Sequence, residues 1–238
     1  HRRHLVPAVD CLNHHATEHQ VEWRLDTAES CINLVATKPI AAGEQICATY
    51  GDYGNDFFFL HYGFVPSKNM DDDVILFDTG TEAVAWYRET VLKEASGLDA
   101  EALCAAALSA VQREQARMEA LEAEAEALDG GWKGGPRPSE TGFRAVRSGQ
   151  VDERLMAALD SFKSGGVPLH PLEAVRRRCV DVMNHFDSSP EEDAALLSDG
   201  GKLSDSMKLL MRYRLGKKVV LLTVMELCKI AIEEEVEK

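Results

Sequence analysis

Apolar residues are distributed differently in the two parts of the chain. Residues 1 to about 78 contain short apolar runs interrupted by Gly, Pro and Asp, whereas the sequence from about residue 79 onward has the residue pattern of helices. Short interrupted runs are typical of strands and turns. The pattern therefore predicts an α+β chain with two domains, residues 1–78 and residues 79–238.

Strands and turns are predicted in the first part. The segment from Pro39 to Gly43 is a predicted turn, and Asn55 is predicted to cap a short helix that reaches His61. The predicted strands cover residues 21–25, 31–37, 44–49 and 73–77.

The second part is predicted to be all-α. Residues 130–138 are rich in Gly and Pro, which disfavour helix, so they are predicted to form a loop. In the last helix the apolar residues recur at three- and four-residue steps. The predicted helices cover residues 81–95, 98–128, 151–164, 172–186 and 204–234.

Composition and charge narrow the class of protein. The chain has 238 residues, 45% of them apolar, which is enough for one large or two modest domains. Its net charge of −14 opposes binding to phosphate backbones, so nucleic acid is not an expected ligand. No apolar run approaches the length of a membrane helix, so no membrane partner is expected either.

Cysteine usage and the first residue bear on the compartment. The six cysteines are spread along the chain without a C-x-x-C pair, which favours a reducing, intracellular compartment over a disulfide framework. The chain begins with His1 rather than Met, so we expect a truncated N-terminus, with which any targeting segment would have been lost. Plastid, cytoplasm and nucleus all remain open as locations.

Three clusters in the first 64 or so residues carry candidate chemistry. They are residues 10–14 (DCLNH), 42–52 (AGEQICATYGD) and 60–65 (LHYGFV). Each alone has an ordinary structural explanation: a cap with a surface imidazole, a turn before a strand, or an aromatic pair with glycine ending a helix. Their common order and spacing make coincidence a weaker explanation.

Together the clusters resemble the C-terminal SET motifs of the Rubisco large-subunit lysine methyltransferase class, which run approximately D-x-x-N-H, aGEe-x-x-x-x-YG and LL-x-x-YGF. Residues 33–40 match the strand before the glycine turn, and residues 209–218 (LLMRYRLGKK) resemble the final helix of that family's substrate-binding domain. The resemblance covers residues 1–78 well and the rest loosely. It implies the C-terminal part of a β-rich SET fold followed by a helical substrate-binding domain.

The resemblance also implies a function. It predicts an S-adenosyl-L-methionine-dependent protein-lysine N-methyltransferase that acts on a non-histone protein presenting a lysine side chain. Asp10 is carried over as either a cofactor neighbour or a support for a helix terminus. The implied site consists of catalytic Tyr50, cofactor-binding Asn13, His14 and Asp10, and substrate-binding Tyr62 and Phe64. The resemblance further implies that the strand carrying Tyr50 passes beside the Asn-His segment, so that the two converge.

Those residue types suit methyl transfer to an amine. A lysine at its ordinary pKa of about 10.4 is almost wholly charged near neutrality, and its lone pair must be freed before it can attack. A narrow apolar channel lowers that pKa by desolvation, and a neighbouring sulfonium lowers it by like charge. Aromatic walls with one hydroxyl exclude water and align the amine.

One departure from the family bears on activity. An intact domain begins with a Gly-rich segment upstream of the Asn-His pair, and nothing before Asp10 corresponds to it. We therefore expect residues 1–238 alone to bind the cofactor weakly and to turn over little or nothing.

Other functions remain open. Some relatives methylate histidine, although Tyr62 favours lysine; the SET part could be inactive beside a helical protein-interaction module; or the chain could be an unrelated helical scaffold. His15 and His19 lie four residues apart, as a zinc pair on a helix would, but no Cys or carboxylate has a matching spacing, so no metal site is expected.

Overall fold

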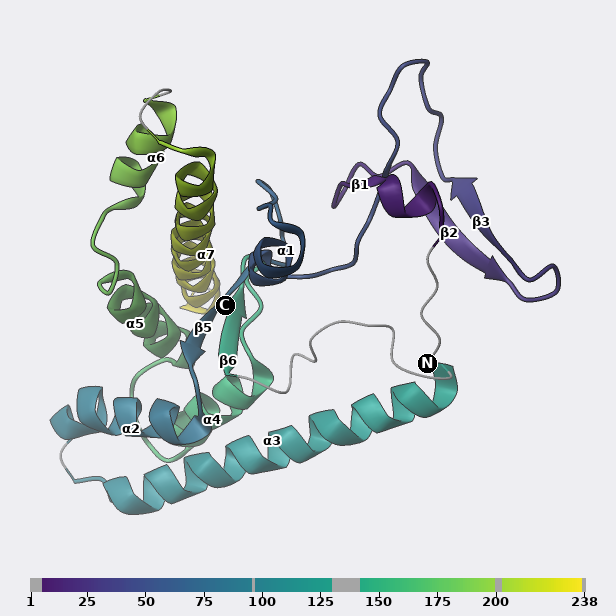
Figure 1. Cartoon of the computed structure of the whole chain (residues 1–238). Coiled ribbons are helices and arrows are strands. Elements are labelled where there is room, and N and C mark those ends of the chain that lie inside the picture. Colours follow the sequence, from purple (N-terminus) through teal and green to yellow (C-terminus); the bar gives the residue numbers. More distant parts are fainter. Residues whose placement is uncertain (1–5, 96, 130–141, 200–202, 237–238) are drawn as a thin grey trace. The chain divides into compact units, whose positions relative to one another are not determined.

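The computed structural model describes residues 6–95, 97–129, 142–199 and 203–236. It divides the chain into two compact units, His1–Tyr53 and Gly54–Lys238, which are described separately below (Figure 1). The predicted α+β class is confirmed, since a mixed sheet lies in the first unit and the second is mostly helical. The packing boundary precedes residue 78, and the assignment of residues 1–78 and 79–238 to two family domains stays a prediction.

A hairpin is the longest regular feature of the first unit. Strands β2 (Val21–Asp26) and β3 (Cys31–Ala36) pair antiparallel along their whole length, which confirms the strands predicted there. The Asp26 side chain closes the turn, because its Oδ1 accepts from the backbone N–H groups of Ala28 and Glu29 at 3.0 and 3.1 Å.

Two very short strands complete the sheet of this unit. After a 3-10 turn (Val9–Cys11), β1 (Asn13–His14) pairs parallel with β4 (Cys47–Ala48), and β4 also pairs parallel with β2. The order is β1-β4-β2-β3. The strand predicted over 44–49 is shorter, because Glu44 is still part of the turn: its carboxylate accepts from Ala41 N–H at 2.8 Å.

The second unit consists mainly of helices. The predicted helices are confirmed except for their exact ends, and the additional helix α6 was missed although Ser189 and Glu192 form the capping box that marks its start. The elements are α1 (Asn55–Tyr62), β5 (Asp73–Phe77), α2 (Gly80–Thr90), a 3-10 turn (Leu92–Glu94), α3 (Ala100–Asp129), β6 (Phe143–Val146), α4 (Glu153–Ser164), α5 (Pro171–Met183), α6 (Pro190–Ser198) and α7 (Asp205–Val236).

A two-stranded sheet corrects the expectation that residues 79–238 are all-α. Strand β6 pairs antiparallel with β5, which itself has the predicted bounds. The four residues of β6 alternate between buried and half-buried positions, a pattern too short to be recognised in a helical context. β6 forms only because it pairs with β5, and many residues of the second unit separate the two strands along the sequence.

The start of α1 also differs from the prediction. Gly54 occupies the cap position, and Asn55 is the first helical residue. The Asn55 side chain is buried and donates to Asp72 Oδ2 at 2.7 Å, while its backbone N–H donates to Asp72 Oδ1 at 3.1 Å. The capping acceptor for α1 is therefore a carboxylate distant in sequence, and the prediction that Asn55 caps the helix was wrong.

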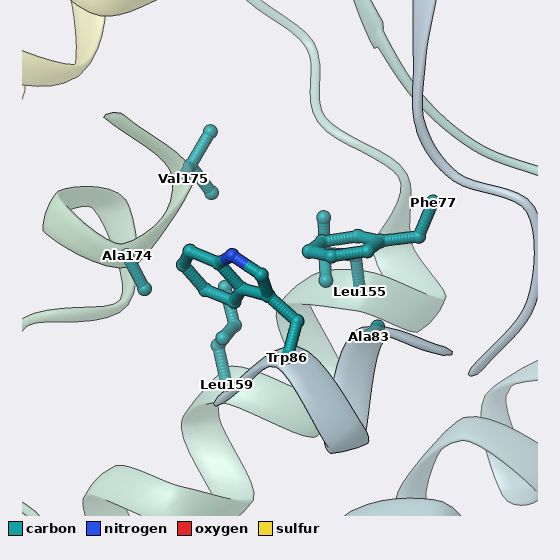
Figure 2. A pocket seen from close by; sticks show the side chains of 7 residues that line it. All are labelled: Phe77, Ala83, Trp86, Leu155, Leu159, Ala174 and Val175. Carbon is teal, nitrogen blue, oxygen red and sulfur yellow. The ribbon is translucent and has the colours of Figure 1, made fainter. Parts of the chain in front are cut away.

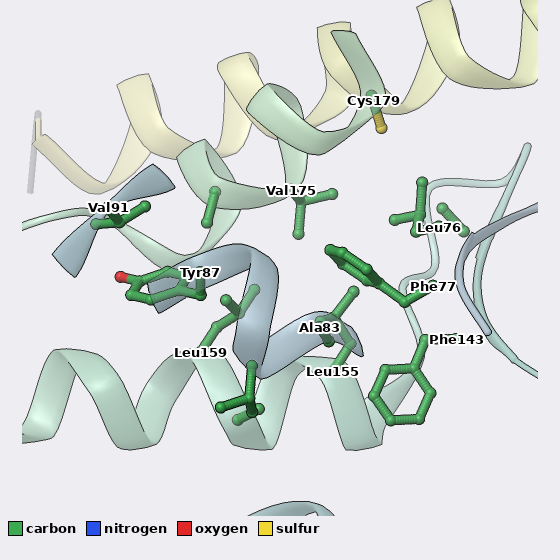
Figure 3. Close-up of a cluster of buried hydrophobic side chains, with 14 of the residues drawn as sticks. Leu76, Phe77, Ala83, Tyr87, Val91, Phe143, Leu155, Leu159, Val175 and Cys179 are labelled. Carbon is green, nitrogen blue, oxygen red and sulfur yellow. The ribbon is translucent and has the colours of Figure 1, made fainter. Parts of the chain in front are cut away.

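The apolar core of the second unit lies between its sheet and helices α2, α4, α5 and α7 (Figure 3). At its centre the rings of Tyr87 and Phe162 stack with centroids 4.1 Å apart and planes 9° apart. Burial raises the pKa of Tyr87 to about 12, so its hydroxyl stays protonated at neutral pH.

A small apolar cavity next to this core is formed only by core side chains (Figure 2). The indole N–H of Trp86 donates to Asp181 Oδ2 at 2.7 Å, which satisfies the single polar group of the lining side chains. The lining residues are Phe77, Ala83, Trp86, Leu155, Leu159, Ala174 and Val175. The cavity is a packing defect of the core and offers no chemical group to a ligand.

Two further findings complete the description. No helix among the described residues combines the length and apolar character that crossing a bilayer requires. The loop predicted at residues 130–138 lies outside the described residues, as do His1 and His4.

The stacked ring pair predicts a large stability effect. Phe162→Ala removes a fully buried ring and should lower the free energy of unfolding of the second unit by about 3–5 kcal/mol. Leu121→Ala, at a half-exposed position of α3, should change it by less than about 0.5 kcal/mol. Urea unfolding followed by circular dichroism measures both, and equal effects of the two variants would contradict this account of the core.

Candidate functional site

The register of β1 and β4 brings the first two sequence clusters together. Asn13 lies opposite Cys47 and His14 opposite Ala48, so the strand that leads into Tyr50 runs beside the Asn-His pair. The backbone N–H of His15 donates to Ala48 O at 3.1 Å and extends the ladder. The predicted convergence of these segments is therefore present within the first unit.

Tyr50 makes contacts with both neighbours of Asn13. Its backbone N–H donates to His14 Nδ1 at 3.1 Å, and its hydroxyl donates to Leu12 O at 2.5 Å. The rings of Tyr50 and His14 lie 5.2 Å apart at an interplanar angle of 47°. These three contacts fix the position of the phenol through the backbone of the predicted cofactor segment.

His14 is held as a neutral imidazole. Burial lowers its pKa from the ordinary value of 6.5, and the nearby imidazoles of His15 and His19 lower it further. Because Nδ1 accepts from Tyr50 N–H, the proton of the neutral ring lies on Nε2. The site around Tyr50 therefore contains polar but uncharged groups: an imidazole, a phenol and the exposed amide of Asn13.

Gln20 stabilises the approach to β4 and was missed in the sequence. Its Oε1 accepts from Cys47 N–H at 2.9 Å, and its Nε2 donates to Glu44 Oε1 at 2.9 Å. Gly43 has a φ of +82°, which explains the glycine of that turn. A buried glutamine has no local sequence signature, so only the tertiary structure reveals that it connects the Gly-Glu turn to the sheet.

Asp10 contacts the backbone of Val6. Its Oδ2 accepts from Val6 N–H at 2.6 Å, and its own backbone N–H donates to Val6 O at 3.1 Å. The carboxylate thus closes the turn that precedes the Asn-His pair. A direct contact of Asp10 with a cofactor stays a prediction.

Tyr62 and Phe64 lie in the second unit, where they form one aromatic cluster. Tyr62 ends α1, Gly63 follows in the left-handed conformation with a φ of +73°, and the chain reverses so that Phe64 lies near the helix. The centroid of Tyr62 is 6.2 Å from that of Phe64, and buried Phe58 is 6.1 and 5.4 Å from the two. The Tyr62 side chain is 49% exposed, so it remains accessible.

His15 has a local protein partner. His15 Nδ1 accepts from Glu18 N–H at 2.9 Å, and residues 16–18 form a turn rather than the helix that chelation by His15 and His19 would need. Among the residues that the structure describes, no cluster of three or more His, Cys, Asp or Glu side chains is arranged for a metal ion.

Comparisons with known proteins give a partial match. No protein-family model matches the chain. It is 40% identical over 70 residues to human N-lysine methyltransferase SETD6 (29% of the chain, 14% of that protein). It is 33% identical over 73 residues to ribosomal lysine N-methyltransferase set10 of Schizosaccharomyces pombe (30% and 13%) and 28% identical over 95 residues to setd6 of Xenopus laevis (40% and 19%).

The match is therefore confined to part of each sequence. The chain spans less than a fifth of the length of these curated relatives, and their similarity covers less than half of the chain. Part of the chain is thus similar to N-lysine methyltransferases, one of which is a ribosomal lysine N-methyltransferase.

The environment of His14 predicts a low midpoint in a pH titration. Its neutral form is favoured on folding, so the ring should titrate below 6.5, and the stability of the first unit should fall as pH drops from 6.5 through the folded pKa. NMR of the ring Cε1–H resonance, assigned with His14→Asn, measures the midpoint. A value at or above 6.5 would contradict the half-buried, neutral imidazole.

Proposed function

We propose that this chain is part of an S-adenosyl-L-methionine-dependent protein-lysine N-methyltransferase that acts on a non-histone protein. The observation that carries the proposal is the double anchoring of Tyr50, to His14 Nδ1 and to Leu12 O. The partial similarity to N-lysine methyltransferases supports it independently.

Tyr50 is the proposed catalytic residue. Its hydroxyl gives its single proton to Leu12 O, so the phenolic oxygen meets the reactants as a hydrogen-bond acceptor. An acceptor in this position can orient the N–H groups of an attacking amine, and its fixed position avoids reorganisation during the reaction.

Asn13 and His14 are the proposed cofactor-binding residues. S-adenosyl-L-methionine, when bound, supplies an electrophilic methyl group on a sulfonium sulfur. A neutral imidazole, an amide and a phenol suit such a cation, because they offer hydrogen bonds without adding positive charge. The exposed Asn13 amide provides both a donor and an acceptor for the polar groups of the cofactor.

Tyr62 and Phe64 are the proposed walls of the channel that receives the substrate lysine. Packed against buried Phe58, they offer an aromatic surface that would remove water from the amine. Desolvation lowers the pKa of an ammonium group and so favours the neutral, nucleophilic amine. A smaller or more polar side chain at either position would leave more of the amine protonated.

Replacement of Tyr50 tests the catalytic role. Tyr50→Phe in the full-length protein should lower methyl transfer by about 10²-fold or more, because an oriented hydrogen-bonding group at the reacting atoms is lost. Tyr53→Phe makes the same change three residues away and should leave the rate within about twofold of wild type.

The measurement is transfer of labelled methyl groups to proteins of an extract from cells that lack the gene. Unchanged transfer by Tyr50→Phe would rule out this residue as the catalytic group. Methylhistidine in place of methyllysine in the hydrolysed product would assign the chain to histidine-directed enzymes.

Asn13 gives a separate test of cofactor binding. Asn13→Ala should weaken binding of S-adenosyl-L-methionine by about tenfold, the effect of losing one or two hydrogen bonds. Asn33→Ala, at an exposed position of β3, is the matched control and should bind as wild type. Calorimetry on the full-length protein measures both, and equal affinities would remove Asn13 from the cofactor site.

A further inference from the structure

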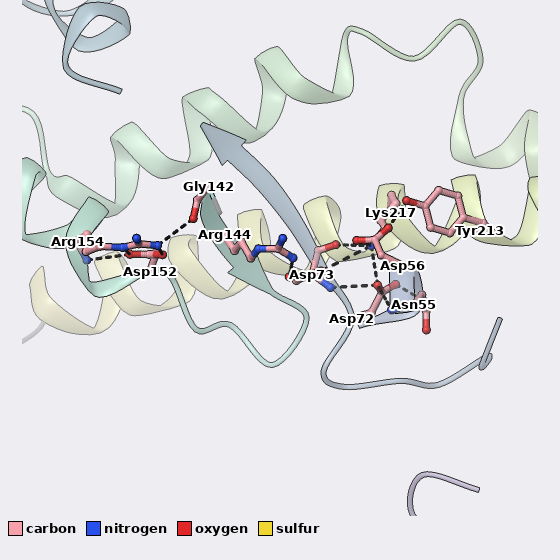
Figure 4. Close-up of polar contacts among 10 residues, drawn as sticks. All are labelled: Asn55, Asp56, Asp72, Asp73, Gly142, Arg144, Asp152, Arg154, Tyr213 and Lys217. Carbon is pink, nitrogen blue, oxygen red and sulfur yellow. Dashed lines mark hydrogen bonds and ion pairs between the residues drawn. The ribbon is translucent and has the colours of Figure 1, made fainter. Parts of the chain in front are cut away.

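A cluster of three carboxylates lies where α1 and β5 begin, and one lysine of α7 reaches all three residues (Figure 4). Lys217 Nζ donates to Asp56 Oδ2 at 3.1 Å, to Asp72 Oδ1 at 2.9 Å and to the backbone oxygen of Asp73 at 2.7 Å. The ammonium group therefore has an acceptor for each of its three protons, as burial of a charge requires.

Lys217 stays charged although it is only 7% exposed. Burial alone would lower its pKa, but the carboxylates of Asp72 and Asp56 outweigh that effect and raise it. Asp72 is buried as well, and burial raises the pKa of its carboxyl while Lys217 opposes the shift. Lys217 therefore opposes the effect of burial on Asp72, whose two oxygens also accept from Asn55.

Asp72 uses this carboxylate to cap α1. Its Oδ1 and Oδ2 accept from the backbone and side chain of Asn55, and Asn55 Oδ1 in turn accepts from Asn69 Nδ2 at 3.0 Å. A negative charge at a helix N-terminus is favourable because the first N–H groups lack partners within the helix. Lys217 therefore acts on α1 through the cap as well as directly through Asp56.

Tyr213 lies one turn before Lys217 on α7 and contacts α1 at two further points. Its hydroxyl donates to Asp56 Oδ1, and its ring stacks on Phe59 with centroids 5.0 Å apart and planes 27° apart. Burial and the neighbouring Asp56 raise the pKa of Tyr213, so it remains a donor.

Gly216 allows this close approach. A Cβ atom there would lie 3.3 Å from Asp72 Oδ2 and 3.4 Å from Asn55 Nδ2, which leaves little room for a side chain. Glycine inside a helix costs about 1 kcal/mol relative to alanine. Its presence in α7 is explained by the packing of this helix against the α1 cap.

The position of α1 in turn determines the position of the aromatic cluster. Phe58, beside Phe59 on the helix, is 1% exposed and lies 6.1 Å from Tyr62 and 5.4 Å from Phe64 between ring centroids. Asp56 and Tyr62 lie on the same eight-residue helix, and Phe64 contacts Tyr62 across the turn that ends it.

We propose that Tyr213 and Lys217 are positioning residues, which fix α1 so that Tyr62 and Phe64 present a defined entrance to the substrate lysine. The inference rests on the proposed function, because it assigns those two rings to the lysine channel. It makes the C-terminal helix a determinant of affinity for the protein substrate, through α1 rather than through contact with the substrate.

The adjacent lysine provides a matched control. Lys218 is fully buried, and its Nζ donates to Ser188 O at 2.6 Å and to Asp193 Oδ2 at 2.6 Å. These partners lie at the start of α6. Replacing Lys217 or Lys218 by Met thus removes the same kind of buried ion pair from one helix, but only Lys217 is bonded to α1 and its cap.

Hydrogen–deuterium exchange of the full-length protein tests the attachment. Lys217→Met and Tyr213→Phe should lower the protection of the α1 amides, whereas Lys218→Met should lower it in α6 and leave α1 unchanged. Tyr213→Phe keeps the stacked ring and tests the inference even if Lys217→Met fails to fold. Unchanged protection of α1 in Tyr213→Phe, or equal loss in Lys218→Met, would overturn the proposal.

Steady-state kinetics test the consequence for substrate. Tyr213→Phe and Lys217→Met should raise KM for the protein substrate about tenfold or more while the Kd of S-adenosyl-L-methionine is unchanged. Reduced exchange protection of α1 together with an unaltered KM would refute the positioning role. Absence of methyl transfer by wild type would refute the proposed function, and the exchange data would still decide whether α7 fixes α1.

Discussion

The arrangement of the first unit depends on the insertion of β4 between two strands that precede it in sequence. Parallel strands cannot be joined by a tight turn, and here the β2–β3 hairpin and the Gly43 turn form the connection from β1 to β4. Two residues of β4 then suffice to place Tyr50 against His14. Gln20 compensates for the short ladder, because it bonds both the strand and the turn that leads into it.

The second unit is organised around buried charges on one helix. Lys217 and Lys218 are neighbours on α7, yet one is bonded to the α1 cap and the other to the start of α6. Buried ion pairs contribute less to stability than their geometry suggests, because desolvation opposes the attraction. An unpaired ammonium in either place would be costly, so packings that separate either lysine from its carboxylates are disfavoured.

Sequence patterns predicted the elements whose apolar spacing is regular, and they failed where an element depends on distant partners. The hairpin and α7 follow from local periodicity. Strand β6 and the capping of α1 by Asp72 do not, because pairing and a buried carboxylate have no local signature. Asn55 even has a residue type suited to capping, but its side chain is bonded elsewhere.

In the candidate site, too, some features were predicted from the sequence and others depend on residues distant along the chain. The convergence of Tyr50 with the Asn-His pair was expected from the resemblance of three motifs, and spacing alone would not have given it. Gln20 holds one set of predicted side chains in place and lies outside the three motifs. Lys217 holds the other set, and it lies in the segment 209–218, for which the sequence indicated a helix but no contact with α1. Buried polar contacts between segments far apart in sequence become visible only once the chain is folded.

The adjacent lysines of α7 have a consequence for how this chain can change in length. Each residue advances a helix by about 100°, so one residue inserted or deleted within α7 before Tyr213 would rotate both ammonium groups relative to the first turns of that helix. Either those first turns or the two lysines would then lose their present contacts. Within α7, length variation among orthologues should therefore lie beyond Lys218, or be compensated by a second insertion or deletion in the same helix that restores the phase.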